Sequence, residues 1–140
     1  MTDLVLDASV ALSWCFKNEA TEAADRVLER LADEAASVPA IWHLEVSNVL
    51  ALSERRQRIT PAGSTEFIAM LETLTIVVDD ETPSRAFGRV LDLARGERLT
   101  AYDAAYLELA MRLGVPLASS KDGDLCDAAE RVGVSVLRAA

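Results

Sequence analysis

Short apolar runs alternate with longer amphipathic segments along almost the whole chain, and this alternation restricts the possible folds more than any other feature. The apolar runs are residues 4–6, 37–41, 76–78, 115–118 and 134–137. Runs of this length are typical of strands that are buried on both faces of a parallel sheet. The pattern therefore predicts an α/β fold: a single three-layer domain over residues 1–140, with a mostly parallel five-stranded sheet covered by helices.

The segments between these runs have the periodicity and the boundary residues of helices. Helices are expected over residues 20–31, 42–57, 60–74, 82–96, 100–113 and 124–132. Thr60 and Thr82 each precede a proline, as an N-cap precedes the first helical residue. Gly96, Gly114 and Gly133 are expected to end helices.

Composition and charge limit the class of protein. With 51% hydrophobic and 26% charged residues, the chain has the balance of a globular domain. No segment approaches the ~20 apolar residues that cross a bilayer, and the first residues lack a signal-peptide pattern, so we expect a cytoplasmic protein. Cys15 and Cys126 match no metal-binding spacing and are expected to be buried thiols.

The net charge of -9 argues against a protein that holds nucleic acid by broad neutralisation of phosphates. It does not exclude a nuclease, because cations held by clustered carboxylates create a positive local site for phosphate.

The expected topology places four acids near one edge of the sheet. Asp7 and Asp122 follow the first and fourth strands, which are neighbours in a sheet of order 3-2-1-4-5. Glu45 lies early in the helix after the second strand, and Asp103 begins the helix before the fourth. Carboxylates brought together repel one another, and Mg²⁺ or Mn²⁺ would relieve that repulsion. Such a site can cleave phosphodiesters without a nucleophilic side chain.

Three of these four acids, and the neighbouring Asp124, also have simpler explanations. Asp7 suits a turn after a strand, and Asp103 suits the third position of a helix that Thr100 caps. Asp122 lies in a loop where acids are common, and Asp124 suits the N-cap of the following helix. It is the joint placement of the acids that favours a functional role.

Glu45 is harder to explain by structure alone. It shares a helix face with Val49 and Leu52, so it is expected to point inward. Asn48, one turn later, either orients Glu45 or lies on a solvated flank. His43 lies on a different face of the helix and is not favoured as a general base.

Four segments carry a recognisable set of motifs: Leu4–Val10, Trp42–Leu50, Leu99–Tyr106 and Leu117–Leu125. In order and approximate spacing they resemble the PIN-domain ribonucleases, and most closely the VapC-type toxins of bacterial toxin-antitoxin pairs. The resemblance covers nearly the whole chain. It implies a Mg²⁺- or Mn²⁺-dependent endoribonuclease that cuts RNA, forms a homodimer and is held inactive by a cognate antitoxin protein.

By this resemblance, Asp7, Glu45, Asp103 and Asp122 are the catalytic, metal-binding acids, and Asp124 is a further candidate ligand. The choice between Asp122 and Asp124 as the fourth ligand stays open, with Asp122 favoured by its spacing from the hydroxyl two residues before it. Three polar residues are expected to support the acids: Ser9, Asn48 and Ser120.

Basic and aromatic residues offer further candidate contacts to RNA. Arg55, Arg56 and Arg58 either bind RNA phosphates or an acidic partner, or simply occupy a solvated helix end where cations are favourable. The aromatic residues could stack on bases but are better explained by packing: Trp14, Trp42, Tyr102 and Tyr106.

Two rival functions fit the sequence less well than a nuclease does, and a third fits it equally well. A receiver-like phosphoacceptor domain requires a lysine after the fifth strand, and a haloacid-dehalogenase-like phosphatase requires a second aspartate where Ser9 stands. A non-catalytic or weakly catalytic dimer, which binds an antitoxin or a structural cation, has the same sequence requirements as the nuclease except for turnover.

Overall fold

A computed structural model describes residues 2–140 and shows a five-stranded sheet in which neighbouring strands are all parallel. The strands occur in the order β3-β2-β1-β4-β5. Their bounds are β1 Leu4–Leu6, β2 Ala36–Pro39, β3 Ile76–Asp79, β4 Leu117–Ser119 and β5 Val136–Arg138. The predicted α/β class and strand order are confirmed, and the sheet is wholly rather than mostly parallel.

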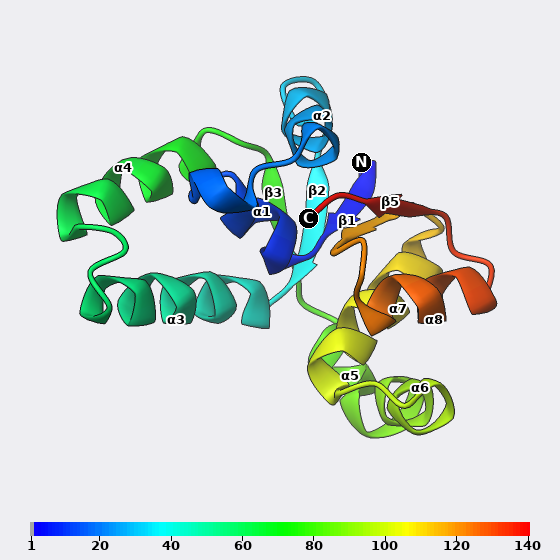
Figure 1. Ribbon diagram of the computed structural model, residues 1–140. Helices are drawn as coiled ribbons and strands as arrows, with labels where there is room; N and C mark the ends of the chain where they lie inside the picture. Colours follow the sequence, from blue (N-terminus) through cyan, green and yellow to red (C-terminus); the bar gives the residue numbers. More distant parts are fainter. Residues whose placement is uncertain (1) are drawn as a thin grey trace.

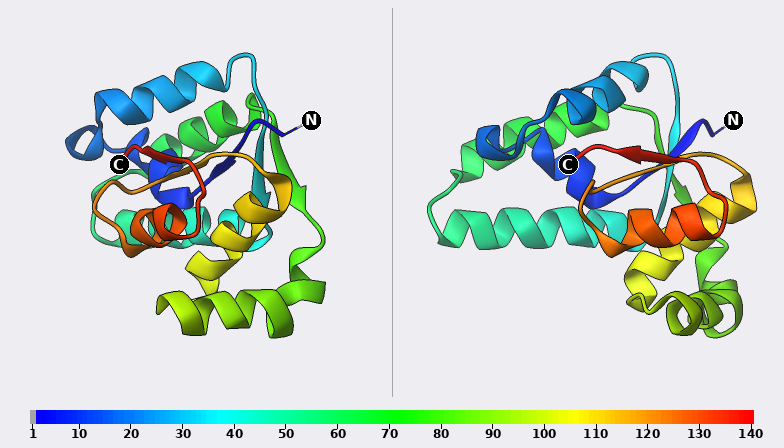
Figure 2. Two further views of the ribbon diagram at one scale, coloured as in Figure 1. Left: turned by 90° about the vertical axis from the view of Figure 1, so that its right-hand side faces the viewer. Right: turned by 45° about the vertical axis from the view of Figure 1, so that its right-hand side comes forward.

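Helices cover both faces of the sheet because the chain first runs outward from β1 to β3 and then continues on the other side with β4 and β5. Right-handed crossovers put the helices of the two halves on opposite faces. Figure 1 shows α1, α3 and α4 to the left of the strands and α7 and α8 to the right, and the right-hand view of Figure 2 agrees. The helical bounds are α1 Ala8–Ser13, η1 Lys17–Glu19, α2 Glu22–Arg30, α3 Ile41–Arg55, α4 Pro61–Glu72, α5 Thr82–Arg85, η2 Ala86–Val90, α6 Leu91–Glu97, α7 Ala101–Leu113 and α8 Asp124–Arg131.

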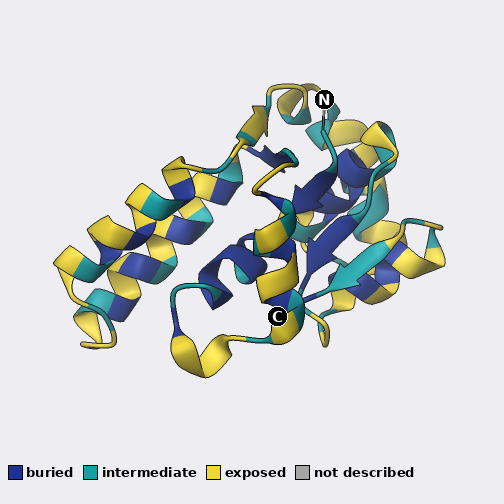
Figure 3. Ribbon diagram, turned by 90° about the horizontal axis from the view of Figure 1, so that it is seen from above, coloured by how far each residue is buried: buried dark blue, intermediate teal, exposed yellow. Residues whose placement is uncertain are grey.

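The core lies around the central strands and α7. Strands β1, β2 and β4 are buried along their whole length, and so is the stretch of α7 from Ala104 to Ala110. In contrast, α3 and α4 alternate between buried and exposed residues and project from the sheet as a helical hairpin (Figure 3). Cys126 is a buried free thiol and Cys15 a partly buried one. Within residues 2–140, no helix has both the length and the apolar character needed to cross a membrane.

Helix α1 is the main element that the sequence pattern did not predict. The chain turns from β1 directly into this six-residue helix, with Asp7 as its N-cap. Every residue of α1 except Ser9 is buried, because the helix packs against α3 and β4. A helix without an exposed polar face has no amphipathic period, and this is why the pattern failed there.

Two helix ends match the prediction and one does not. Gly114 and Gly133 adopt the positive φ angles of 68° and 83° that follow a helix end. The expected end at Gly96 is wrong, because α6 continues to Glu97 and Arg98 takes the left-handed position with φ of 57°. The segment before it is also not one regular helix, since η2 forms a π-helical turn.

Candidate active site

Asp7 stands where β1 ends, and two neighbouring hydroxyl groups fix its side chain. The amide of Asp7 donates to the carbonyl of Ala118, which aligns the end of β1 with the end of β4. This register brings Ser119 beside Asp7, and Ser119 Oγ donates to Asp7 Oδ2 at 2.6 Å. Ser9 Oγ donates to the same oxygen at 3.1 Å. The supporting contact expected of Ser9 is therefore present in the structure, and Ser119 provides a second one.

Glu45 lies beside the buried face of α3 rather than at its centre. The buried residues of this helix include Trp42, Val46 and Leu50, whereas Leu52 is 36% exposed, so the inward face is one residue later than predicted. The partly buried Glu45 carboxylate accepts a hydrogen bond of 2.5 Å from the hydroxyl of Tyr106 on α7. Burial holds the pKa of the Tyr106 phenol above its usual range, so this hydroxyl remains a donor.

Asp103 lies in the first turn of α7, where capping does not require its carboxylate. Thr100 is the N-cap, and its hydroxyl accepts from the backbone amide of Asp103 at 3.1 Å. The predicted cap is thus confirmed, but it uses the main chain of Asp103. The partly buried side chain of Asp103 is left available for another role.

The three carboxylates influence one another electrostatically. The pKa of Glu45 is raised, first by burial and then by the charges of Asp7 and Asp103, while the hydrogen bond from Tyr106 opposes the rise. The pKa of Asp103 is also raised, first by burial and then by Asp7 and Asp124. Among the described residues, no lysine or arginine contributes to either shift. A site of uncompensated negative charge therefore lies beyond the ends of β1 and β4.

Asp122 and Asp124 are both exposed, but only Asp124 acts electrostatically on Asp103. Asp124 is the first residue of α8 and is among the charges that raise the pKa of Asp103. It is not the N-cap of α8, a position that Gly123 occupies. Asp122 is exposed in the turn before the helix, and the hydroxyl of Ser120 donates to the carbonyl of Ala140 rather than toward an acid.

The donor set suits a hard divalent cation, because carboxylate oxygens are the ligands that Mg²⁺ and Mn²⁺ prefer. A cation would offset both the burial and the neighbouring negative charges that raise the pKa values of Glu45 and Asp103. Within residues 2–140, however, no three acidic, histidine or cysteine side chains are close enough to form a complete metal site.

The family model for the PIN domain matches residues 4–131, which include Asp7, Glu45, Asp103, Asp122 and Asp124. This chain belongs to the PIN domain family. PIN domains are generally nucleases, and they typically use divalent metals. The resemblance to PIN domains drawn from the four sequence motifs is thus confirmed.

Two solved structures show the same PIN fold. PAE2754 from Pyrobaculum aerophilum superimposes with a TM-score of 0.69 at 20% sequence identity, covering 97% of this chain and 91% of that chain. FitAcB from Neisseria gonorrhoeae gives a TM-score of 0.66 at 19% identity, with 96% of each chain covered. No curated protein matches the sequence. At these identities the structural likeness shows the fold alone.

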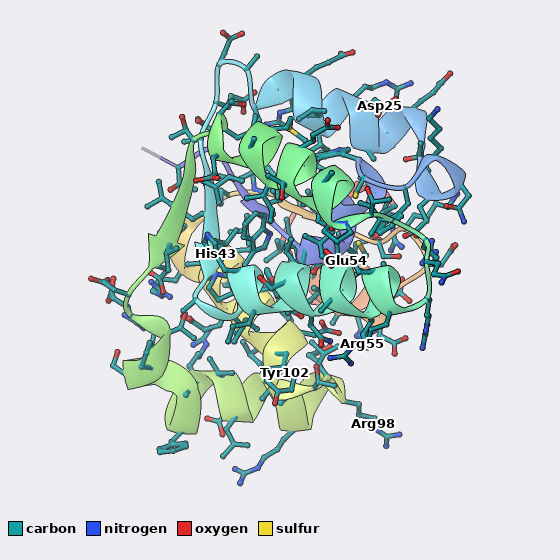
Figure 4. All side chains as sticks on the ribbon, turned by 90° about the vertical axis from the view of Figure 1, so that its left-hand side faces the viewer. Asp25, His43, Glu54, Arg55, Arg98 and Tyr102 are labelled. Carbon is teal, nitrogen blue, oxygen red and sulfur yellow. The ribbon has the colours of Figure 1, made fainter. Side chains whose placement is uncertain are left out.

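Among the described residues, the other polar side chains that the sequence singled out make no hydrogen bond to the acids of this PIN domain. His43 lies on the side of α3 that faces α4, whereas Tyr102 lies on the opposite side (Figure 4). Asn48 is exposed, and Glu45 receives its hydrogen bond from Tyr106 instead. Arg58 pairs with a glutamate, Glu19, at 3.0 Å.

The remaining arginines and aromatic residues divide between surface and core. Arg55 and Arg56 are exposed at the C-terminal end of α3, as a solvated helix end requires. Trp42 and Tyr106 are buried, and the indole Nε1 of Trp14 donates to a backbone carbonyl, so packing is favoured over base stacking for these three aromatics. Of the four aromatic candidates, Tyr102 is the most exposed, at 63%.

Sequence reasoning missed the two hydroxyl donors that contact the acids from a distance, Ser119 and Tyr106. The sequence patterns favour packing or stacking for Tyr106, and they favour Ser120 as the supporting hydroxyl in the loop after the fourth strand. The available signal for Ser119 was the alternation of side chains along β4. Because successive residues of a strand point to opposite faces of the sheet, only every second residue at the end of β4 can lie on the same face as Asp7. Using it requires the register of β1 and β4, which the sequence does not specify.

Proposed function

We propose that this PIN domain is a metal-dependent endoribonuclease that cleaves RNA phosphodiester bonds and acts as the toxin of a toxin-antitoxin pair. The observation that carries the proposal is the grouping of three partly buried carboxylates, Asp7, Glu45 and Asp103, with no cationic side chain acting on Glu45 or Asp103. A protein keeps such a cluster when a ligand of opposite charge offsets its cost. The membership in the PIN family supports nuclease chemistry as the use of that ligand.

The proposed ligands of Mg²⁺ or Mn²⁺ are Asp7, Glu45 and Asp103, joined by a fourth acid. Asp122 has the expected spacing in the motif, while Asp124 has the electrostatic contact with Asp103. When bound, the cation would neutralise charge on the phosphodiester and on the leaving oxygen. The carboxylates hold and orient that cation, and the hydroxyl of Ser9 steadies Asp7.

The proposed partners are an RNA substrate, a cognate antitoxin protein and a second copy of the chain. An exposed apolar surface supports a protein partner. The cavity of about 480 Å³ between the start of α3, α5 to α6 and the start of α7 is lined by Ile41, Pro83 and Phe87 among others. Phe87 is 95% exposed, and large apolar side chains left in solvent are typical of surfaces that another protein covers.

The nuclease proposal is tested with protein purified free of any partner. RNA is incubated with wild type in Mg²⁺ or Mn²⁺, with wild type plus EDTA, and with the Asp7→Asn variant. We expect cleavage only by wild type with metal. Equal cleavage by Asp7→Asn, or cleavage that survives EDTA, contradicts the proposal. Metal binding without cleavage by a folded protein would favour a non-catalytic module that binds a cation or an antitoxin.

A further inference from the structure

Asp7, which follows β1, and Glu45, near the start of α3, share a detail of hydrogen bonding that metal binding alone does not explain. In each of two carboxylates, one oxygen receives a hydroxyl donor from a distant element. Tyr106 on α7 donates to Oε1 of Glu45 at 2.5 Å, and Ser119 on β4 donates to Oδ2 of Asp7 at 2.6 Å. The partners are 61 and 112 positions apart in the sequence, so these contacts are products of the tertiary fold.

Both donors are rigidly placed. Tyr106 is 0% exposed and Ser119 is 1% exposed, and each lies within a regular element. A buried tyrosine has little rotational freedom, because close-packed neighbours allow only one rotamer. Ser119 is set by the parallel pairing of β4 with β1. Neither hydroxyl can follow its carboxylate if that side chain rotates, so the hydrogen bond restrains the carboxylate.

The second oxygen of each carboxylate is held less firmly. Within residues 2–140, Oε2 of Glu45 receives no hydrogen bond, and Oδ1 of Asp7 has only a long contact of 3.5 Å from the amide of Ser9. A carboxylate with one oxygen engaged by a fixed hydroxyl presents the other as a single, oriented ligand. Glu45 and Asp7 both have this arrangement.

We infer that Tyr106 and Ser119 are positioning residues that restrict Glu45 and Asp7 to one free ligating oxygen each. This inference rests on the proposed function, since it concerns the cation that the acids would hold. Without the hydroxyl, each carboxylate gains rotational freedom that must be lost again when the cation binds. Affinity for the cation should therefore fall while the fold is retained.

The test measures binding of Mn²⁺ alone to the full chain, by calorimetry and by the electron paramagnetic resonance of free Mn²⁺. Tyr106→Phe and Ser119→Ala each remove one hydroxyl. Two matched controls remove a hydroxyl elsewhere: Tyr102→Phe on the same helix as Tyr106, and Ser37→Ala at a buried position of β2. Circular dichroism confirms that each variant is folded before titration.

We expect Tyr106→Phe and Ser119→Ala to weaken Mn²⁺ binding by about 10-fold to 100-fold, as loss of groups that orient metal ligands usually does. The two controls should bind as wild type does. Because the two hydroxyls act on different carboxylates, Ser119→Ala gives a separate answer if Tyr106→Phe does not fold. Affinities equal to wild type in the folded test variants, or equal losses in the controls, overturn the inference.

Cleavage of RNA by wild type is measured in the same preparations to separate this inference from the proposed function. Wild type that binds Mn²⁺ but does not cut RNA refutes the nuclease, while the comparison of affinities still decides the role of Tyr106 and Ser119. Wild type that cuts RNA while the variants keep full affinity refutes the positioning role alone. Wild type that binds no Mn²⁺ overturns the inference, because there is then no cation to position.

Discussion

The guanidinium of Arg112 on α7 donates two hydrogen bonds to Asp79 at the end of β3, of 2.9 Å to Oδ1 and 3.0 Å to Oδ2. The same guanidinium bonds to both oxygens of Glu108, which is 2% exposed. Arg112 itself is only 12% exposed in its side chain. This ion pair network ties an edge strand of the sheet to the helix that carries Asp103 and Tyr106.

Removing Arg112 should be costly, because the buried charge of Glu108 would keep only Arg85, at 4.0 Å, as a cationic partner. We expect Arg112→Ala to lower the free energy of unfolding by about 3 kcal/mol. Urea denaturation followed by circular dichroism measures the change. Arg26→Ala is the matched control, since its partner Glu22 is exposed and the pair should contribute less than about 0.5 kcal/mol. Similar losses in the two variants would contradict a structural role for the network.

The network should also make stability depend on acid. The pKa of Asp79 is lowered, chiefly by its hydrogen bonds from Arg112. A carboxyl with a lowered folded pKa contributes stability above its unfolded pKa of about 3.9 and loses it as the pH falls through the folded value. The Asp79→Asn variant should therefore be less stable than wild type at neutral pH, and this difference in the free energy of unfolding should shrink below about pH 4. A difference that is constant from neutral pH to acid would rule out this linkage.

The candidate ligands should have the opposite dependence in the absence of metal. Because the folded pKa values of Glu45 and Asp103 are raised, their contribution is fully present below the unfolded values of about 4 and is lost as the pH rises. In EDTA, Glu45→Gln and Asp103→Asn should gain stability relative to wild type between acid and neutral pH. Thermal unfolding at several pH values measures this gain, and saturating Mn²⁺ should reverse it by stabilising wild type. If either variant were less stable than wild type at neutral pH in EDTA, the repulsion between the carboxylates would be contradicted.

Asp7 combines a structural role with its proposed role in metal binding, and two substitutions separate them. Asparagine can still cap α1 and accept from Ser119, so Asp7→Asn should change stability little. Asp7→Ala removes the cap and should lower stability by about 1 kcal/mol. Both variants should lose cleavage of RNA. Retained cleavage by Asp7→Asn, measured beside a stability curve, would show that Asp7 acts only as a cap.

The fourth acid can be identified by comparing two neighbours. Since Asp124 and not Asp122 is among the charges that raise the pKa of Asp103, we expect Asp124→Asn to weaken Mn²⁺ binding more than Asp122→Asn, by about 10-fold or more. Calorimetric titration of the two variants gives the comparison. The reverse order would restore Asp122, which the motif spacing favours.

The sequence predicted the sheet and most helices because their signals are local. Apolar runs, prolines after Thr60 and Thr82, and glycines at helix ends each act within a few residues, and the strand order followed from the alternation. Helix α1 was missed because burial on all sides removes its amphipathic period. The end at Gly96 was wrong because Arg98 adopts the left-handed conformation that glycine usually takes.

The sequence could place the candidate acids near one another, but it could not identify the side chains that hydrogen-bond to them. Asp7, Glu45 and Asp103 could be placed at one edge because strand ends and helix starts are local features. The contacts of Ser119 and Tyr106 depend on register and packing between elements that are far apart in sequence. Which of Asp122 and Asp124 lies nearer the site depends on where the turn ends and α8 begins, and a shift of two residues there would put one in the place of the other.

The central place of β1 sets the order in which the protein can acquire its activity during synthesis. β1 is made first, yet one of its edges is closed by β4, which emerges only after residue 117. For most of translation that edge stays unpaired, and Asp103, Ser119 and Asp124 are not yet available. Under the proposed function, a ribosome-bound chain therefore cannot cleave RNA until α8 is nearly complete, and pairing of the open edge of β1 with another chain is the hazard of that interval.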